Sequence, residues 1–343
     1  MDFSLFYFTY DGAGGCQRAL HSLLIEGARF ADRHGFTAVW TPEQHFHPFG
    51  GIYPNPALAG AAVAAITDRI EIRAGSVVGP LHDPIGNAEE WAMVDNLSDG
   101  RVALSFGPGW GGTDFVLAPE DYSQRREVLL RTIDTVRRLW RQEEIELADG
   151  TAEPASKSIY PAPIRPEVPF WLTSAGSLET FRAAGQIGAG LLTHLLCHNL
   201  DELAKKITIY REAYAGTEAP QVAVMLPAFL GQDREVVRRT ARVPFLRTQA
   251  GQLLHAPGDV LPGVDPDDVA PEDLEFVVEQ AFDSYIESGG LFGQVEVAAR
   301  LLDRLAEIGV DEVACMIDLD VEASAVLASL GHLAALKDAW RRS

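Results

Sequence analysis

Residues 3–40 read FSLFYFTYDGAGGCQRALHSLLIEGARFADRHGFTAVW. An apolar run at residues 3–8 predicts a β-strand, and a shorter run at residues 37–40 predicts a second one. Between them, leucine and alanine recur at helical spacing over residues 19–34, until Gly35 ends the pattern. The stretch therefore predicts a strand, a helix and a second strand, which is the repeating unit of a parallel sheet.

The same alternation continues to the end of the chain. Further strands are expected at residues 70–74, 102–106, 169–172, 190–195, 222–226 and 312–317. Further helices are expected at residues 57–66, 85–97, 124–141, 178–187, 200–215, 234–242, 272–288, 295–308 and 323–341. Eight strands with helices between them predict the α/β class and a (β/α)₈ TIM barrel with insertion loops, rather than a sandwich or a bundle.

Two segments interrupt this alternation. Residues 147–167 are rich in proline and polar residues and are expected to form a loop. Residues 244–293 are too long for a simple helix-to-strand connection, and such insertions in enzymes commonly cover the substrate. We therefore expect one domain over residues 1–343, with residues 244–293 as a lid or insertion within it.

Composition narrows the classes of partner. The formal net charge is -21, from 49 acidic and 28 basic residues, so nucleic acid and anionic membranes are disfavoured. The three cysteines, Cys16, Cys197 and Cys315, lie far apart and form neither a disulfide framework nor a zinc motif. The sequence shows no signal peptide and no long uncharged apolar run, so a cytoplasmic location is expected.

In a barrel of this kind, functional residues follow the carboxyl ends of the strands. The second expected strand is followed by TPEQHFHPFGG, which places Glu43, Gln44, His45 and His47 in one loop. A lone histidine is more often structural, but two histidines beside a carboxylate suit proton transfer. This loop is one candidate site, and no metal is expected there.

Small residues follow the third and fifth expected strands. Ala74, Gly75 and Ser76 would let a planar ligand approach the main chain closely, although tight barrel packing explains them equally well. The string TSAGS at residues 173–177 leads into a helix, whose amino end suits a phosphate group. Simple helix capping by Ser174 or Ser177 is the alternative. The glycines after the fourth strand lack the lysine of a phosphate-binding P-loop.

Several strings together resemble a known family. They are GSVVGPLHDP at residues 75–84, AEEWAMVDNLSDGRV at residues 88–102, Gly109–Trp110, FVLAPEDY at residues 115–122 and RRE at residues 125–127. They resemble the bacterial luciferase-like superfamily, and within it the FMN-dependent monooxygenases of natural-product biosynthesis, the mupirocin oxygenase-like branch. The resemblance runs from residue 3 to about residue 319 and is weakest over residues 244–293.

The resemblance implies a barrel that binds reduced FMN and uses dioxygen to oxygenate an organic substrate. The flavin ring would lie near Phe8, Ala74, Gly75, Ser76 and Ser105, with a non-prolyl cis peptide between Gly75 and Ser76. The phosphate would contact the residues that follow the fifth strand and open the next helix, namely Ser174, Ala175, Gly176, Ser177 and Thr180.

The resemblance also implies roles around the pocket. His45 would handle protons, with Glu43 and His47 orienting it, because imidazole titrates near neutral pH. In bacterial luciferase the loop after the second strand reads EHHF, and this chain has Gln44 in place of the first of those histidines. The substrate pocket would be lined by Trp40, Gln44, Trp110 and His194.

The same resemblance implies partners and leaves other functions open. Reduced FMN would come from a separate flavin reductase, and the substrate would be a small molecule or a group tethered to a carrier protein. Dimers are common in the family, so a homodimer is compatible with the sequence. A deazaflavin-dependent oxidoreductase, a non-catalytic flavin-binding protein and a flavin-free barrel enzyme remain alternatives, which cofactor binding and oxygen consumption would separate.

Overall fold

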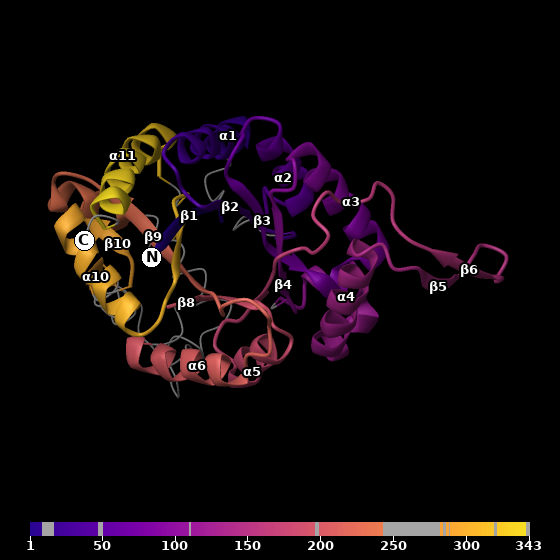
Figure 1. The fold of residues 1–343 in the computed structure, drawn as a ribbon. Coiled ribbons are helices and arrows are strands. Elements are labelled where there is room, and N and C mark those ends of the chain that lie inside the picture. Colours follow the sequence, from indigo (N-terminus) through magenta and orange to yellow (C-terminus); the bar gives the residue numbers. More distant parts are fainter. Residues whose placement is uncertain are drawn as a thin grey trace, which may run out of the picture.

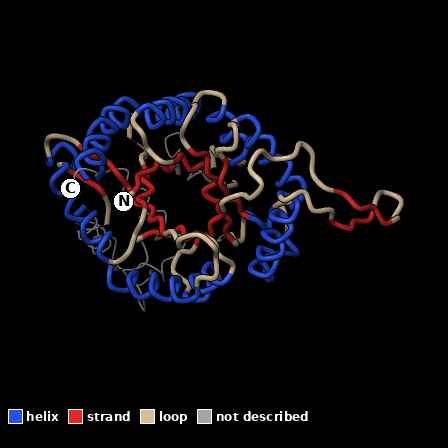
Figure 2. The backbone as a smooth tube through the Cα atoms, viewed as in Figure 1, coloured by secondary structure: helices blue, strands red, loops and turns tan. Residues whose placement is uncertain are grey.

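The computed structural model describes residues 1–8, 17–46, 51–109, 111–195, 199–242, 282–283, 286–287, 289–318 and 321–340. The barrel strands in it are β1 (Asp2–Phe6), β2 (Ala38–Thr41), β3 (Glu71–Val78), β4 (Val102–Gly107), β7 (Phe170–Thr173), β8 (Gly190–His194), β9 (Val222–Leu230) and β11 (Glu312–Met316). Each pairs in parallel with the next, and β8–β9, β9–β11 and β11–β1 pairs close the ring. Figure 2 shows this closed ring of strands inside a ring of helices, which is the predicted (β/α)₈ barrel.

The helices follow the strands around the outside of the barrel (Figure 1). They are α1 (Gln17–Arg33), α2 (Pro56–Ala64), α3 (Pro84–Leu97), α4 (Arg125–Trp140), α5 (Leu178–Gln186), α6 (Leu200–Ala213), α10 (Val295–Glu307) and α11 (Ala323–Trp340). Asn55 and Asp83 begin α2 and α3 because their side chains accept backbone N–H groups of the first turn and proline follows each. Among the described residues, no helix is both long and apolar enough to cross a membrane.

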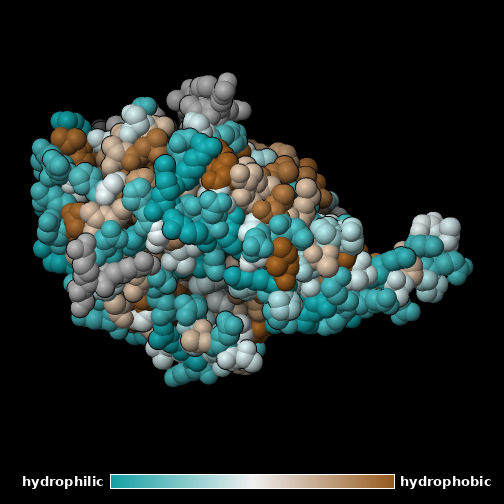
Figure 3. Space-filling view, turned by 45° about the horizontal axis from the view of Figure 1, so that its top comes forward, coloured by the Kyte–Doolittle hydropathy of each residue, from teal (hydrophilic) through white to brown (hydrophobic). Residues whose placement is uncertain are grey.

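The structure differs from the sequence prediction between α4 and β7. The expected loop at residues 147–167 begins inside a two-stranded antiparallel hairpin of β5 (Ile145–Ala148) and β6 (Pro154–Lys157). The Asp149 carboxylate forms its turn by accepting the N–H groups of Thr151 and Glu153. These strands were not predicted because each is only four residues long and most of their side chains are exposed. The hairpin projects from the barrel with a largely hydrophilic surface (Figure 3).

The segment expected as a lid, residues 244–293, lies mostly outside the described residues, as does the helix expected at residues 272–288. Its last part forms a short strand, β10 (Leu291–Gly293), which extends the sheet beside the end of β9.

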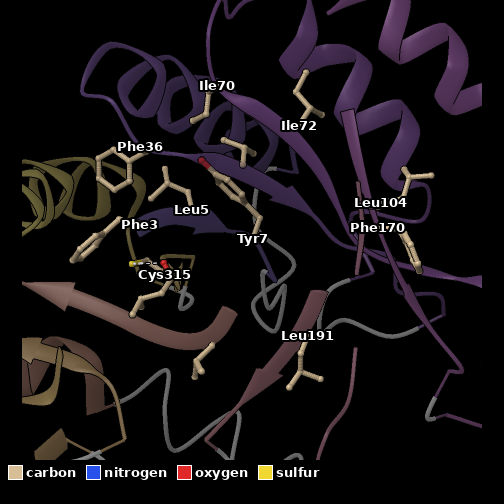
Figure 4. Packing of buried hydrophobic residues seen from close by; sticks show 14 of the residues in the cluster. Phe3, Leu5, Tyr7, Phe36, Ile70, Ile72, Leu104, Phe170, Leu191 and Cys315 are labelled. Atoms are coloured by element: carbon tan, nitrogen blue, oxygen red, sulfur yellow. Dashed lines mark hydrogen bonds between the residues drawn. The ribbon is translucent and has the colours of Figure 1, made fainter. Parts of the chain in front are cut away.

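Side chains alternate across each strand, so every strand contributes to two cores. In β1, Phe3 and Leu5 face outward into the large core between strands and helices, part of which is drawn in Figure 4. Phe6 belongs instead to the smaller cluster inside the barrel, which includes Trp40 and Trp171. The rings of Phe3, Phe6, Trp40 and Trp171 are all buried. The barrel is therefore filled by side chains and not open from end to end.

A buried ion pair crosses the barrel interior below the carboxyl ends of the strands. Arg73 on β3 donates to both carboxylate oxygens of Glu312 on β11, at 3.0 and 2.8 Å. The Arg73 guanidinium lies 4.8 Å from the Trp40 ring centre and 5.1 Å from that of Trp171. Glu312 also accepts hydrogen bonds from Ser4 and from the Trp40 indole. We call these five residues the barrel floor, because they fill the interior beneath the site.

Candidate functional site

Three hydroxyl groups meet at the carboxyl ends of β3, β4 and β7. The Thr173 hydroxyl lies 2.5 Å from that of Ser76 and 2.7 Å from that of Ser105. Ser105 pairs with Trp171 in the β4–β7 register, so Thr173 is the next inward-facing residue on β7. Two hydrogen bonds among three hydroxyls use two of their hydrogens, which leaves one O–H to donate to a ligand. We call Ser76, Thr173 and Ser105 the hydroxyl chain.

Gly75 lies directly before the hydroxyl chain. The cis peptide expected between Gly75 and Ser76 is present. A Cβ atom on Gly75 would lie 2.9 Å from both Phe6 and Trp40, so the space toward the barrel floor admits only glycine. Ala74, by contrast, is fully buried in the outer core, which leaves only its main chain for contact with a ligand at the barrel mouth.

A buried carboxylate joins the loops after β2 and β3. Glu43 Oε1 accepts hydrogen bonds from Nε2 of His45, at 2.9 Å, and from Nε2 of His82, at 2.7 Å. Glu43 Oε2 accepts the N–H of Val78 at 2.8 Å. The Glu43 side chain is fully buried, whereas those of His45 and His82 are 12% and 19% exposed. The sequence predicted the Glu43–His45 pair, and the structure adds His82, which follows the short helix η1 (Gly79–Leu81).

This cluster is built for holding protons and not for holding a metal. Carboxylate oxygens only accept, so both Nε2 atoms carry hydrogen and offer no lone pair to a cation. Burial raises the pKa of Glu43, but hydrogen bonds from His45, His82 and Val78 outweigh it and lower the pKa below its usual value. Burial lowers the pKa of His82, and Glu43 with Glu90 raises it overall. In the described part of the chain, no group of three or more His, Cys, Asp or Glu side chains could hold a metal ion.

Gln44, the residue beside this cluster, is buried and faces a carboxylate. Its side-chain nitrogen lies 3.4 Å from Asp114 Oδ2 at the start of the short helix η2 (Asp114–Val116), and Asp114 is itself 3% exposed. An amide neither gives up nor takes up a proton near neutral pH. Gln44 therefore offers hydrogen bonds but no exchangeable proton at this side of the barrel mouth, where the neighbouring imidazoles are the groups able to carry one.

The loop after β7 leads into α5 as expected for an anion site. Ser177 is the residue before the helix, and its side chain makes no capping hydrogen bond within the described residues. The Ser174 hydroxyl accepts the Gly176 N–H at 3.4 Å, and Gly176 has a φ of 147°, which suits glycine. The first N–H groups of α5 are thus available to a ligand. Thr180 lies half-buried in the first turn, and Ala175 is exposed beside it.

The opposite side of the barrel mouth is apolar. Phe8, Met225 and Met316 are partly buried and pack against the cluster inside the barrel. The Phe8 N–H donates to both oxygens of Asp318, at 2.7 and 2.8 Å, which fixes the chain after β1. His194 ends β8 in a half-buried position.

One further expected site residue lies away from the barrel mouth, and two are not among the described residues. Trp40 is fully buried in the barrel floor, where its indole N–H donates to Ser4 at 2.8 Å, so protein covers the ring. His47 and Trp110 lie outside the described residues. Their expected roles, like those of the other site residues, stay predictions.

Sequence reasoning missed Thr173, His82 and Asp114. Thr173 was visible as an inward position two residues after Trp171, once the register of β7 is known. His82 lies 39 residues after Glu43, and nothing in that spacing indicates that the two side chains meet. Such contacts depend on the closure of the barrel.

Comparisons with known proteins show the family of this chain. The family model described as luciferase-like monooxygenase matches residues 1–312. An uncharacterized protein of Mycobacterium tuberculosis is 27% identical over 216 residues, which cover 58% of this chain and 77% of that protein. The oxygenase component of a flavin-dependent trigonelline monooxygenase from Acinetobacter baylyi is 27% identical over 225 residues, which cover 64% of this chain and 62% of that protein.

Solved structures share the architecture. Monooxygenase RslO1 from Streptomyces bottropensis superposes with a TM-score of 0.78 at 22% identity, covering 98% of each chain. The oxygenating constituent of 3,6-diketocamphane monooxygenase from Pseudomonas putida, in complex with FMN, gives a TM-score of 0.74 at 19% identity, covering 97% of this chain and 96% of that one. An F420-dependent secondary alcohol dehydrogenase gives 0.67 at 17% identity, covering 95% and 98%. These likenesses show the fold, and the family match shows that the chain belongs to the luciferase-like monooxygenases.

Proposed function

We propose that this chain is a flavin-dependent monooxygenase that binds reduced FMN at the carboxyl ends of β3, β4 and β7 and uses dioxygen to oxygenate an organic substrate. The observation that carries the proposal is the hydroxyl chain, which lies beside Gly75 and has one O–H left to donate. A flat heteroaromatic ring with acceptor atoms on its edge suits a bed of small side chains with one hydroxyl donor.

The residues present fit the two parts of FMN. Gly75, Ser76, Ser105 and Thr173 offer small side chains and hydroxyl donors for the ring. Ser174, Ala175, Gly176, Ser177 and Thr180 would hold the phosphate, because an uncapped helix amino end supplies N–H donors and a positive dipole. Arg126 of α4 lies beside this end of α5, where it pairs with Glu179 at 3.2 Å, and adds positive charge nearby.

In this proposal the flavin supplies the electrons that activate dioxygen, and the protein supplies binding, water exclusion and proton handling. Phe8, Met225 and Met316 form an apolar wall that limits water at the barrel mouth. Glu43 fixes the ring of His45 so that its other nitrogen, Nδ1, is the one available for proton transfer. The barrel floor beneath them closes the pocket from the opposite end of the barrel.

The finer points of the proposal rest on resemblance. A separate flavin reductase is the proposed partner, in keeping with the Acinetobacter baylyi relative, which is named an oxygenase component. A role in secondary-metabolite biosynthesis, on a small or carrier-tethered substrate, rests on the sequence strings at residues 75–127. The deazaflavin alternative has a specific observation behind it, since the F420-dependent dehydrogenase shares the barrel.

The test is an anaerobic titration of the purified protein with reduced FMN, followed by rapid mixing with aerated buffer and recording of absorbance. We expect saturable binding and a transient absorbance that free reduced FMN does not give. A parallel titration with a reduced deazaflavin cofactor is the comparison. Tight binding of the deazaflavin with no binding of FMN would overturn the proposal, as would binding of neither.

A further inference from the structure

The contact between Glu43 and two histidines has a consequence for protonation. One carboxylate oxygen accepts a hydrogen bond from Nε2 of both His45 and His82, and the other oxygen accepts the Val78 N–H. Since both Nε2 atoms carry hydrogen, Nδ1 is the nitrogen at which each ring gains or loses a proton. No hydrogen bond within the described residues engages either Nδ1 atom.

The charges in this cluster favour one imidazolium. An ionised Glu43 carries one negative charge inside the protein, and one protonated ring neutralises it. His82 is the better placed of the two rings for that proton, because Glu90 on α3 adds a second negative charge near it. On the other side of η1, the residues of α4 next to Gly79 are Leu129 and Thr132, which carry no charge. The short helix η3 (Pro119–Gln124) also contacts η1 and contains the acidic residues Glu120 and Asp121.

The reaction proposed above needs a proton. In the balanced reaction, the substrate, dioxygen, an anionic reduced flavin and one proton give the oxygenated substrate, water and the oxidised flavin. Gln44 stands in the same loop and does not titrate, so the proton has to come from a neighbouring group or from solvent.

We propose that His82 is the proton donor of the site and that Glu43 positions its ring, together with that of His45, through one carboxylate oxygen. His82 supplies the proton from Nδ1 as an imidazolium, with its Nε2–H held by Glu43. This inference rests on the proposed flavin-dependent function for the reaction that uses the proton, and on the Glu43–His82 contact and the nearby charge of Glu90 for the choice of His82.

The Glu43–His82 contact can be tested on the protein without flavin. Nuclear magnetic resonance of protein labelled with ¹⁵N-histidine reports which ring nitrogen carries hydrogen and the pH at which each ring titrates. We expect His82, identified by its loss in His82→Gln, to titrate above an ordinary imidazole, and its midpoint to fall in Glu43→Gln. An unchanged His82 midpoint in Glu43→Gln would overturn the claim that Glu43 holds the proton on His82.

The role in turnover is tested by His82→Gln, which keeps an N–H donor for Glu43 but holds no proton. We measure the rate at which protein-bound reduced FMN is reoxidised by dioxygen as a function of pH. In the wild-type protein the rate should fall about tenfold per pH unit above the His82 midpoint. In His82→Gln the rate at neutral pH should be about a hundredfold lower than in the wild type, and it should not change with pH in that range.

A matched control is His34→Gln, because His34 is exposed and stacks on the Phe30 ring at the end of α1, away from the site. This variant should have the wild-type pH profile. The two levels of failure are separable by the binding of reduced FMN, measured for every variant. If reduced FMN does not bind the wild-type protein, the proposed function fails. If it binds and His82→Gln keeps the wild-type profile, the role of His82 fails and the function stands.

Discussion

The amino and carboxyl ends of the barrel both contain buried polar groups, but these groups have different partners. At the amino end, the Arg101 guanidinium donates to the carbonyl oxygens of Ser98, Thr67 and Ile70 at 2.6 to 2.8 Å. The Asp32 carboxylate accepts three consecutive N–H groups, from Asp68 to Ile70. These side chains bind the main chain and hold the loops between helices and strands in place.

At the carboxyl end, the polar side chains bind mainly one another. Within the described residues, the hydroxyl chain is closed on itself except for one O–H, and the Glu43 cluster bonds to the main chain through the Val78 N–H. Groups of this kind keep donors and acceptors for a ligand. The contrast assigns stability to the amino end, and the proposed function places binding and chemistry at the carboxyl end, as in other barrels of this class.

The largest effect is expected at the barrel floor, between the two ends. Arg73→Met leaves the Glu312 carboxylate buried without its partner, so the free energy of unfolding should fall by about 3 to 5 kcal/mol, as measured by urea denaturation. The double variant Arg73→Met/Glu312→Leu removes both charges and should recover most of this loss. A single variant as stable as the wild type would show that the ion pair does not hold the floor together.

At the amino end, Asp32→Ala deprives three N–H groups of their acceptor. We expect a loss of about 2 to 3 kcal/mol in the free energy of unfolding and no change in the affinity for reduced FMN. Denaturant titration and anaerobic flavin titration measure the two quantities. A weakened flavin affinity in a folded variant would break the comparison between the ends.

At the carboxyl end the opposite pattern is expected. Thr173→Val removes the central hydroxyl but keeps the shape of the side chain, and should weaken reduced FMN binding by about tenfold, which is about 1.4 kcal/mol. Thr173→Ser keeps the hydroxyl and should bind as the wild type does. Equal affinities of Val and Ser variants would show that the hydroxyl chain is not part of the flavin site.

The smallest effect concerns the pH dependence of stability. Because the folded-state pKa of His82 is raised, the Glu43–His82 contact stabilises the fold fully below the ordinary imidazole pKa and less as pH rises through the raised value. The lowered pKa of Glu43 has the opposite sense, with stability lost as pH falls through it. Melting temperatures of wild type and His82→Gln should therefore converge as pH rises from about 6 to about 9. A constant difference over that range would contradict the shift.

The sequence was sufficient for the barrel because its signals are local. Apolar runs, helical periodicity and breaks such as Gly35 recur in each unit, and the predicted strands and helices that fall within the described residues agree with the structure to within a few residues. The hairpin β5–β6 was missed because each strand has only four residues, too few for a clear alternating pattern, and only Ile145 among them is buried.

The candidate site was predictable only as separate strings. Glu43 and His45 lie in one loop, so their contact was expected, and so were Ser76 and Ser105 at strand ends. His82 and Thr173 join them through long-range closure, at separations of 39 and 97 residues from Glu43 and Ser76. The arrangement depends on barrel registers that no local pattern specifies.

The most direct test of the account is hydrogen–deuterium exchange of the backbone with and without reduced FMN under anaerobic conditions. We predict that FMN slows exchange at residues 75–78, 105–107 and 173–180, and leaves residues 67–70 and 98–101 at the amino end unchanged. Protection confined to the amino end, or no protection at a saturating concentration of reduced FMN, would contradict a flavin site at the carboxyl end of the barrel.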